Sequence, residues 1–170
     1  SDDKHSEDWI FVLGHELLKK RILKPGKDVT SRPMNGQMVT VRYSGTLYHQ
    51  PDTVVDNSDR LTFTLGDGDV IMAFDLCVAL MELGEIAEVV TDPKYAYGPS
   101  GKEPSIPANA TLHYELELLS VEDAPKITEL SALERASRAN QKRERGNGLY
   151  AKGEYSQAIS SYTKALQFVD

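Results

Sequence analysis

The sequence is poor in the residues and runs that mark several classes of protein. Its single cysteine, Cys77, excludes an intramolecular disulfide and is typical of a reducing compartment. No run approaches the ~20 apolar residues that are needed to cross a bilayer, and no segment has the pattern of a signal peptide. The four histidines have no ligand spacing with Cys77, so we predict no zinc site.

Positive charge is scarce in the first two thirds of the chain. The formal net charge is -7, and residues 1–121 hold 19 acidic and 11 basic side chains, whereas residues 122–170 hold 7 and 8. An acidic surface repels phosphate backbones, so we expect no nucleic-acid partner. The change in composition also separates two parts of the chain.

Alternating apolar residues predict antiparallel strands in the first part. The clearest is the segment 111–119, where apolar residues recur at every second position and Tyr114 is expected to point into the core. Shorter patterns predict strands near residues 17–23, 37–44, 61–65 and 86–90, with Tyr43 on a buried face and a hairpin or bulge over residues 46–56.

One segment between these strands changes to helical spacing. Ile71, Phe74, Val78 and Met81 predict an amphipathic helix over residues 70–83, with Asp69 as its N-cap and Gly84 as its C-cap. Several antiparallel strands wrapped around one amphipathic helix form an α+β domain.

The last part of the chain predicts a pair of helices. Gly146, Tyr150, Tyr155, Ala158 and Tyr162 occur in a pattern that resembles one tetratricopeptide repeat. A solenoid needs about three repeats to bury its faces, so we expect the array to continue beyond this sequence. We therefore divide the chain into a disordered tail (1–8), a sheet domain (9–121), a linker (122–127) and a first tetratricopeptide repeat (128–170).

Motifs in the sheet domain identify a family resemblance. Tyr95-Ala-Tyr-Gly98 followed by Ile106-Pro107 resembles the C-terminal half of the tacrolimus-binding (FKBP-type) immunophilins, which are peptidyl-prolyl isomerases. Val39-Thr-Val-Arg-Tyr-Ser-Gly45 and Phe63-Thr-Leu-Gly66 occur upstream in that family's order. The resemblance implies an FKBP-like fold and an isomerase domain over residues 9–121.

The resemblance also implies a pocket for a prolyl ring. Its catalytic residues would be Tyr43, Asp56 and Tyr97, with Tyr97 donating a hydrogen bond to a substrate carbonyl. The remaining pocket positions would be Val55, Phe63, Val70, Ile71, Phe74, Ile106 and Tyr114. Any single one of these aromatic residues is more often a core residue than a ligand contact, but ten matching positions together favour a pocket. Asp56 is the most informative of them, because an aspartate is a poor core residue and the main alternative is a position in an exposed loop.

Departures from the family pattern predict a weak enzyme. Phe74 stands where the family usually has tryptophan at the pocket floor, and Val55 stands where it often has phenylalanine. A shallower or wider floor lowers the expected affinity for tacrolimus-like ligands. Twisting an X-Pro bond needs neither a nucleophile nor a cofactor, because the barrier is the loss of amide resonance.

Two interpretations remain open for Asp67-Gly-Asp69. The two carboxylates could hold a hard cation such as Ca²⁺ or Mg²⁺, or the segment could be a turn in which Asp69 caps the helix. The surrounding Gly-Asp-x-Asp-Val-Ile pattern resembles a divergent, membrane-anchored branch of the family at the mitochondrial surface. That branch implies a cation-sensitive loop and two kinds of partner, calmodulin and anti-apoptotic Bcl-family proteins.

The helical part adds a candidate binding site. Arg143 and Asn147 resemble half of the clamp by which tetratricopeptide domains hold the C-terminal carboxylates of Hsp chaperones, and a solvated basic face is the simpler alternative. Two functions follow: a weak isomerase on a protein-binding scaffold, or a catalytically vestigial co-chaperone. The resemblance implies a location on the cytosolic side, with an anchor in the mitochondrial outer or endoplasmic reticulum membrane.

Overall fold

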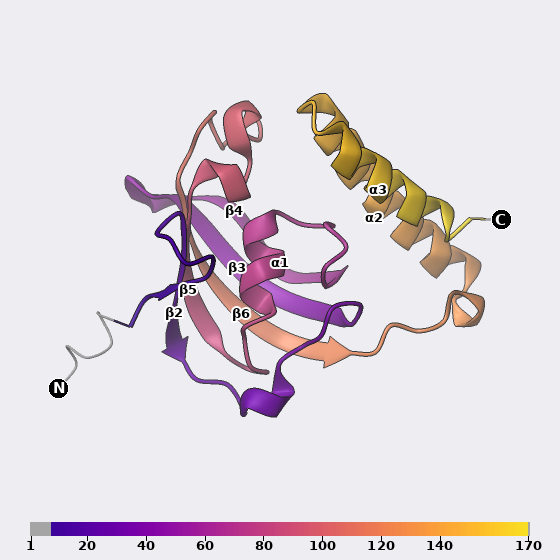
Figure 1. Cartoon of the computed structure of the whole chain (residues 1–170), viewed down its shortest axis with the longest axis horizontal. Helices are drawn as coiled ribbons and strands as arrows, with labels where there is room; N and C mark the ends of the chain where they lie inside the picture. The colour runs from indigo at the N-terminus through magenta and orange to yellow at the C-terminus, as the bar shows by residue number, and fades with distance from the viewer. Residues whose placement is uncertain (1–7, 170) are drawn as a thin grey trace.

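A computed structural model of the chain describes residues 8–169 (Figure 1). Residues 1–7 of the expected disordered tail and residue 170 lie outside this range. The first part is a six-stranded antiparallel sheet in the order β1-β2-β5-β6-β3-β4. The strands are β1 (Ile10–Phe11), β2 (Leu18–Lys24), β3 (Met38–Leu47), β4 (Gln50–Thr64), β5 (Ile86–Thr91) and β6 (Leu112–Glu122).

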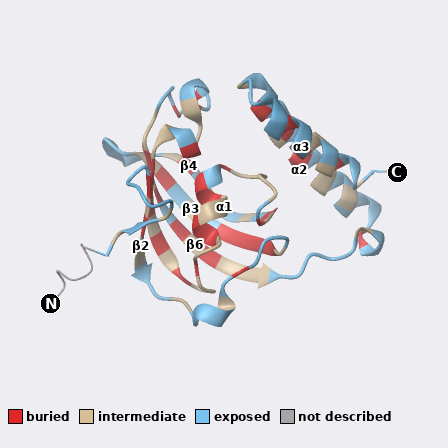
Figure 2. Ribbon diagram, in the orientation of Figure 1, coloured by how far each residue is buried: buried red, intermediate tan, exposed pale blue. Residues whose placement is uncertain are grey.

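The period-two pattern of the sequence determines which face of the sheet is buried. Tyr114, Leu116 and Leu118 of β6 are buried, and Val39 and Val41 of β3 lie beside them. The buried face wraps around the short helix α1 (Met72–Val78), as Figure 2 shows. This arrangement confirms the predicted α+β fold.

Helix α1 is shorter than predicted. It begins at Met72, not at Val70, and its N-cap is Ile71, so the prediction that Asp69 caps it is wrong. The reason lies in the preceding loop, where the Asp75 side chain accepts hydrogen bonds from the backbone N–H groups of Gly66 and Gly68 at 2.9 and 3.1 Å. These bonds hold the loop in a non-helical conformation up to Ile71.

The end of α1 also differs from the prediction. Its C-cap is Ala79, so the helix does not reach Gly84. Gly84 instead has a positive φ of 86° in the turn before β5 and donates its N–H to the carbonyl of Leu118 on β6. The turn needs glycine because a side chain is strained in this region.

Strand β4 runs through the segment that the sequence divides into a hairpin and a separate strand. It extends over residues 50–64, and the hairpin is confined to the two residues between β3 and β4. The pairing of β3 with β4 shifts register after Val41, Gly45 and Thr46. These irregularities interrupt the alternation of apolar residues, which is why periodicity did not reveal one long strand.

Two antiparallel helices follow the sheet. Helix α2 (Ala132–Ala151) begins with a capping box of Ser131 and Glu134, and helix α3 (Tyr155–Leu166) packs against it. Gly146 allows the close approach, because an added Cβ atom would lie 2.6 Å from the Tyr162 ring. Figure 1 shows this helical hairpin facing α1 and the loop before it. None of the helices within residues 8–169 is both long and apolar enough to span a membrane.

Candidate functional site

Three tyrosine hydroxyl groups converge on one buried carboxylate. Asp56 lies on β4 and accepts hydrogen bonds from Tyr114 of β6 at 2.7 Å, from Tyr97 at 3.0 Å and from Tyr43 of β3 at 3.4 Å. Only 8% of the Asp56 surface is exposed. Residues that lie far apart in the sequence therefore form one hydrogen-bonded cluster, and the carboxylate fixes the orientation of all three phenol groups.

The phenol groups of this cluster act as hydrogen-bond donors at neutral pH. Burial, with a contribution from the charge of Asp56, raises the pKa of Tyr43 to about 12. The same causes raise the pKa values of Tyr97 and Tyr114 above the ordinary value for tyrosine. All three therefore keep their protons, as a site that hydrogen-bonds a neutral amide requires.

Aromatic rings in edge-to-face contact surround the same point. Phe74 of α1 lies 4.9 Å from the ring centroid of Tyr43 and 4.9 Å from that of Tyr114, at interplanar angles of 67° and 76°. Gly45 makes room for Tyr114, because a Cβ atom there would lie 2.4 Å from Tyr114 Cε1. These contacts give the site a rigid apolar floor.

The structure brings half of the predicted pocket residues to a single cavity of about 440 Å³. Tyr43, Val70, Ile71, Phe74 and Tyr97 line it. Asp56 lies behind this lining, bonded to Tyr43 and Tyr97. The other predicted positions do not line the cavity: Phe63, Ile106 and Tyr114 are buried in the core, and Val55 packs against the core from a half-buried position.

Sequence reasoning missed several residues of the cavity. Leu61, Asp69 and Lys102 line it from the first domain, and Gln141, Glu144 and Arg145 line it from helix α2. Leu61 could have been found from its alternation with Phe63. No local pattern could have placed α2 at the cavity, because that contact depends on how the two parts of the chain pack.

Asp67 and Asp69, the candidate cation ligands, lie together and contact an ammonium group. Lys142 Nζ of α2 lies 3.0 Å from Asp67 Oδ2 and 3.0 Å from both carboxylate oxygens of Asp69. Within the described part of the chain, no group of three or more His, Cys, Asp or Glu side chains could hold a metal ion. A bound cation would therefore have to displace Lys142.

Arg143 and Asn147 line one groove between α2 and α3. The groove has a volume of about 590 Å³, and Tyr162, Ala165 and Leu166 form its apolar side. The Tyr162 hydroxyl donates to Asn147 Oδ1, and Arg143 donates to Asn140 Oδ1. Both polar side chains are exposed on the surface of the hairpin.

Comparison with known proteins identifies relatives of the sheet domain. The chain is 43% identical over 100 residues to the peptidyl-prolyl cis-trans isomerase FKBP4 of Bos taurus, a match that covers 58% of this chain and 22% of that protein. It is 33% identical over 153 residues to FK506-binding protein 5 of Rhizopus delemar, covering 88% of this chain and 38% of the relative. The chain thus spans less than two fifths of the length of these curated relatives.

A solved structure supports the same assignment. The crystal structure of the three FKBP domains of wheat FKBP73 matches with a TM-score of 0.62 and 29% identity, and covers 68% of this chain and 49% of that one. Residues 29–119, more than half of the chain, match the family described as FKBP-type peptidyl-prolyl cis-trans isomerase. The chain therefore belongs to the family of FKBP-type peptidyl-prolyl cis-trans isomerases.

Proposed function

We propose that this chain catalyses cis-trans isomerisation of X-Pro bonds in the cavity beside Asp56. The observation that carries the proposal is the cluster of three tyrosine hydroxyl groups held by one buried carboxylate around an aromatic floor. Uncatalysed rotation has a barrier of ~18–20 kcal/mol, which comes from amide resonance. A dry cavity favours the twisted bond, because the twisted amide has less charge separation than the planar amide and loses less on leaving water.

Each residue has a separate part in this proposal. The prolyl ring would rest against Phe74, with Val70 and Ile71 beside it. Tyr97 would turn its hydroxyl from Asp56 to a substrate carbonyl, while Tyr114 and Tyr43 keep Asp56 in place. Tyr97 suits this part because it lines the cavity and is only half-buried, whereas Tyr114 is fully buried.

We propose that the activity is low. Phe74 gives a smaller floor than the tryptophan that the family resemblance implies, so both a prolyl ring and a tacrolimus-like ligand would make fewer contacts. Lys102 and Lys152 also lie with their ammonium groups 5.4 and 5.3 Å from the centroid of the Tyr97 ring. Lys102 lines the cavity, and a charged group there keeps water in it, which works against transfer of the amide out of water.

Substitution of Tyr97 tests the catalytic proposal. Tyr97→Phe should lower the catalysed exchange rate of a Leu-Pro peptide by a factor of about two to ten, because a hydrogen bond worth roughly 0.5–1.5 kcal/mol is lost in the transition state. Two-dimensional exchange NMR measures the rate. Tyr48→Phe is the matched control, since Tyr48 is exposed and lies outside the cavity. Exchange that is equally fast in Tyr97→Phe and wild type would remove Tyr97 from the mechanism.

We also propose that the helical hairpin is a protein-binding scaffold of the tetratricopeptide type. The observation that favours it is the groove in which Arg143 and Asn147 lie together beside apolar residues. Such a groove would accept the C-terminal carboxylate of an Hsp-type chaperone. If the chain has no isomerase activity, binding of partners at this groove would be its function, and the chain would be a binding module.

A carboxylate-terminated peptide tests the scaffold proposal. A peptide with a free, acidic C-terminus should bind about 10- to 150-fold more tightly than its amidated form, because a charge-assisted hydrogen bond contributes about 1.5–3 kcal/mol. Arg143→Ala should remove the difference. Fluorescence anisotropy measures the affinity. Arg138→Ala removes a charge from the same helix outside the groove and should change nothing. Equal affinity of wild type for both peptides would refute the clamp.

We propose the other partners and the location on the resemblance of residues 66–71, 75–76 and 97–99 to the divergent branch of the family. These partners are calmodulin and anti-apoptotic Bcl-family proteins. The same resemblance supports a site of action on the cytosolic side of the mitochondrial outer or endoplasmic reticulum membrane.

A further inference from the structure

Helix α2 forms one wall of the cavity beside Asp56, in which the prolyl ring is proposed to bind. Gln141, Glu144 and Arg145 of α2 line the cavity together with Tyr43 and Phe74 of the first domain. We propose that α2 is an autoinhibitory lid over this cavity and that Lys142 is the latch that holds it closed. The inhibitory effect of the lid rests on the proposed isomerase function, but the latch and the lid can be measured without catalysis.

The latch is a cluster of balanced charge in which the side chains of Lys142 and Asp69 are buried and those of Asp67 and Lys164 are half-buried. Lys142 Nζ bonds both Asp67 and Asp69, and the side chains of Lys142 and Asp69 are 3% and 2% exposed. Lys164 of α3 adds a second ammonium group 3.3 Å from Asp67 Oδ1. Two positive and two negative groups therefore meet where the hairpin contacts the loop before α1, and loss of one partner would leave an uncompensated buried charge.

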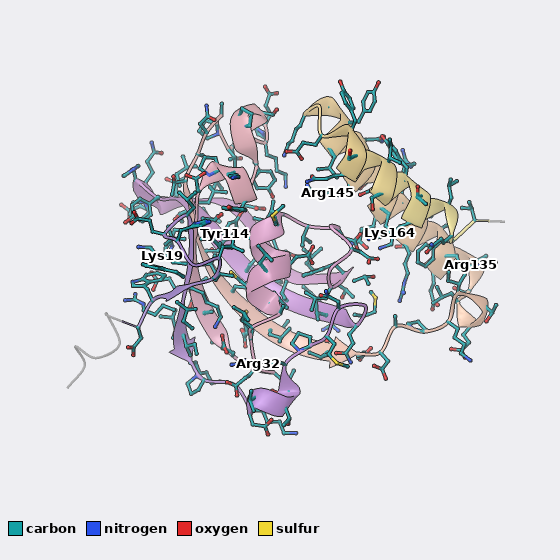
Figure 3. All side chains as sticks on the ribbon, in the orientation of Figure 1. Lys19, Arg32, Tyr114, Arg135, Arg145 and Lys164 are labelled. Atoms are coloured by element: carbon teal, nitrogen blue, oxygen red, sulfur yellow. The ribbon has the colours of Figure 1, made fainter. Side chains whose placement is uncertain are left out.

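Two further contacts orient α2 on the first domain. Arg145 Nε donates to the carbonyl of Gly68 at 2.8 Å, and Gln141 Nε2 donates to the carbonyl of Thr62 at 3.0 Å. Figure 3 shows Arg145 and Lys164 on the side of the hairpin that faces the first domain. Because Gln141 and Arg145 also line the cavity, the contacts that dock the helix are the contacts that cover the cavity.

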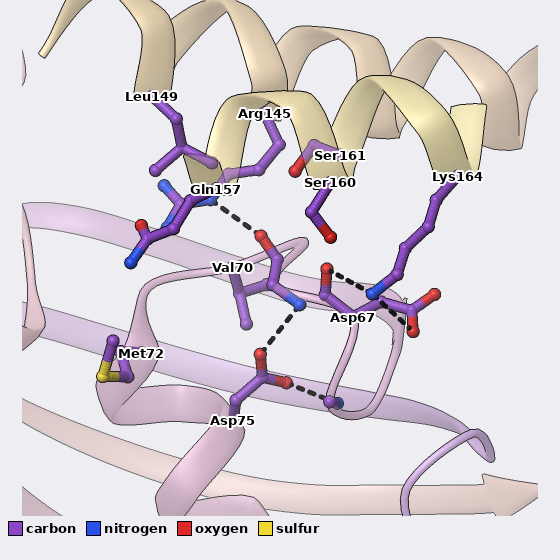
Figure 4. Close-up of a pocket in the computed structure, with 12 residues that line it drawn as sticks. Asp67, Val70, Met72, Asp75, Arg145, Leu149, Gln157, Ser160, Ser161 and Lys164 are labelled. Atoms are coloured by element: carbon purple, nitrogen blue, oxygen red, sulfur yellow. Dashed lines mark hydrogen bonds and ion pairs between the residues drawn. The ribbon is translucent and has the colours of Figure 1, made fainter. Parts of the chain in front are cut away.

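The interface between the helical hairpin and the first domain is of a kind that can open. The contacts that dock the helices on the first domain are hydrogen bonds and ion pairs, which water can replace. Polar interfaces within a chain are typical of parts that move relative to each other. A second cavity of about 250 Å³ lies between the loop and the helices, beside Asp67, Asp75 and Arg145 (Figure 4). Leu149 of α2 is the one apolar residue that the two helices contribute to its lining, and Val70 and Met72 line it from the first domain. The docked state therefore depends on the latch.

The experiment compares Lys142→Met with wild type in the full chain. Methionine is unbranched, is one heavy atom shorter than lysine and carries no charge. Amide hydrogen exchange of residues 132–151 reports on the latch. Broadening of the Tyr97 and Phe74 ring signals by the soluble nitroxide TEMPOL reports on whether the lid covers the cavity. Peptide exchange NMR reports on the catalysed rate.

We expect the amide groups of α2 in Lys142→Met to lose protection from hydrogen exchange and both rings to become accessible to TEMPOL. We also expect kcat/KM for a Leu-Pro peptide to rise roughly tenfold or more. The reason is that breaking a buried ion pair strongly destabilises the state that contains it. Asp67→Asn/Asp69→Asn should reproduce all three effects, which guards against a folding defect of a single variant. Arg138→Met is the control, since Arg138 lies on the same helix outside both cavities.

Each outcome decides one part of the proposal. Unchanged protection of α2 in both latch variants would overturn the latch. Lost protection with unchanged TEMPOL broadening would overturn the lid. Exposed rings with an unchanged rate in a chain that does catalyse would overturn autoinhibition. If no variant catalyses exchange but the rings become exposed, the lid stands and the isomerase proposal falls.

Discussion

Replacing Asp56 by alanine is expected to lower both catalysis and stability. Tyr114 is fully buried, so its hydroxyl would lose its acceptor with no water to replace it, at a cost of about 1–3 kcal/mol. Tyr43 and Tyr97 are half-buried and would be partly rescued by water. We therefore expect the free energy of unfolding to fall by about 2–4 kcal/mol, counting all three groups.

The loss of catalysis should be larger than the loss of any one tyrosine. Without Asp56 the three hydroxyl groups lose their common acceptor, and a misplacement of about 1 Å can cost about 100-fold in rate. We expect kcat/KM for a Leu-Pro peptide to fall by about that factor. Exchange NMR gives the rate, and urea unfolding followed by circular dichroism gives the stability.

Two variants give this prediction its controls. Asp56→Asn keeps an acceptor oxygen and should retain most of the stability, so it separates the orienting effect from the folding effect. Asp52→Ala removes an exposed carboxylate from the same strand and should change the free energy of unfolding by no more than about 0.5 kcal/mol. If Asp56→Ala were as active as Asp52→Ala, the cluster would be structural only.

The second large effect is expected at a charge pair inside the sheet domain. Lys20 Nζ of β2 lies 2.7 Å from Glu85 Oε2, and both side chains are only 1% exposed. Glu85→Gln would leave the ammonium group of Lys20 without its counter-ion. Because an unpaired buried charge is strongly unfavourable, the free energy of unfolding should fall by about 3–5 kcal/mol.

Removing both charges should restore much of this loss. Lys20→Met/Glu85→Leu replaces the pair by apolar side chains of similar volume, which is often neutral for stability. Urea unfolding of the wild type, Lys20→Met, Glu85→Leu and the double variant measures the coupling between the two residues, and Glu85→Gln is unfolded under the same conditions. A double variant as unstable as Glu85→Gln would show that packing around Glu85, and not the charge of Lys20, causes the effect.

Local periodicity was sufficient to predict most of the sheet. The alternation around Tyr114 and Val39 depends only on which face of a strand is buried, and that is decided within a few residues. The Asp56 cluster could be predicted only through the family resemblance, because its tyrosines come from β3, β6 and the loop at Tyr97. No spacing in the sequence indicates that these three hydroxyl groups meet.

The errors arise where a side chain overrides local propensity. Asp69 looks like a helix cap, but it accepts from the backbone N–H of Thr64 and binds Lys142, and Asp75 holds the loop up to Ile71. The docking of α2 is the extreme case, because Lys142 finds its partners more than 70 residues earlier in the chain. Sequence patterns of one helix cannot contain that information.

The position of β6 has a consequence for synthesis. This strand lies between β5 and β3 and pairs with both, yet it is the last strand of the sheet to be made. Until residues 112–122 have left the ribosome, the nascent chain can form only two separate ribbons, β1-β2-β5 and β3-β4, whose unpaired edges β5 and β3 are exposed. Such edges invite pairing with other chains. The nascent domain therefore depends most on chaperone protection just before its central strand emerges.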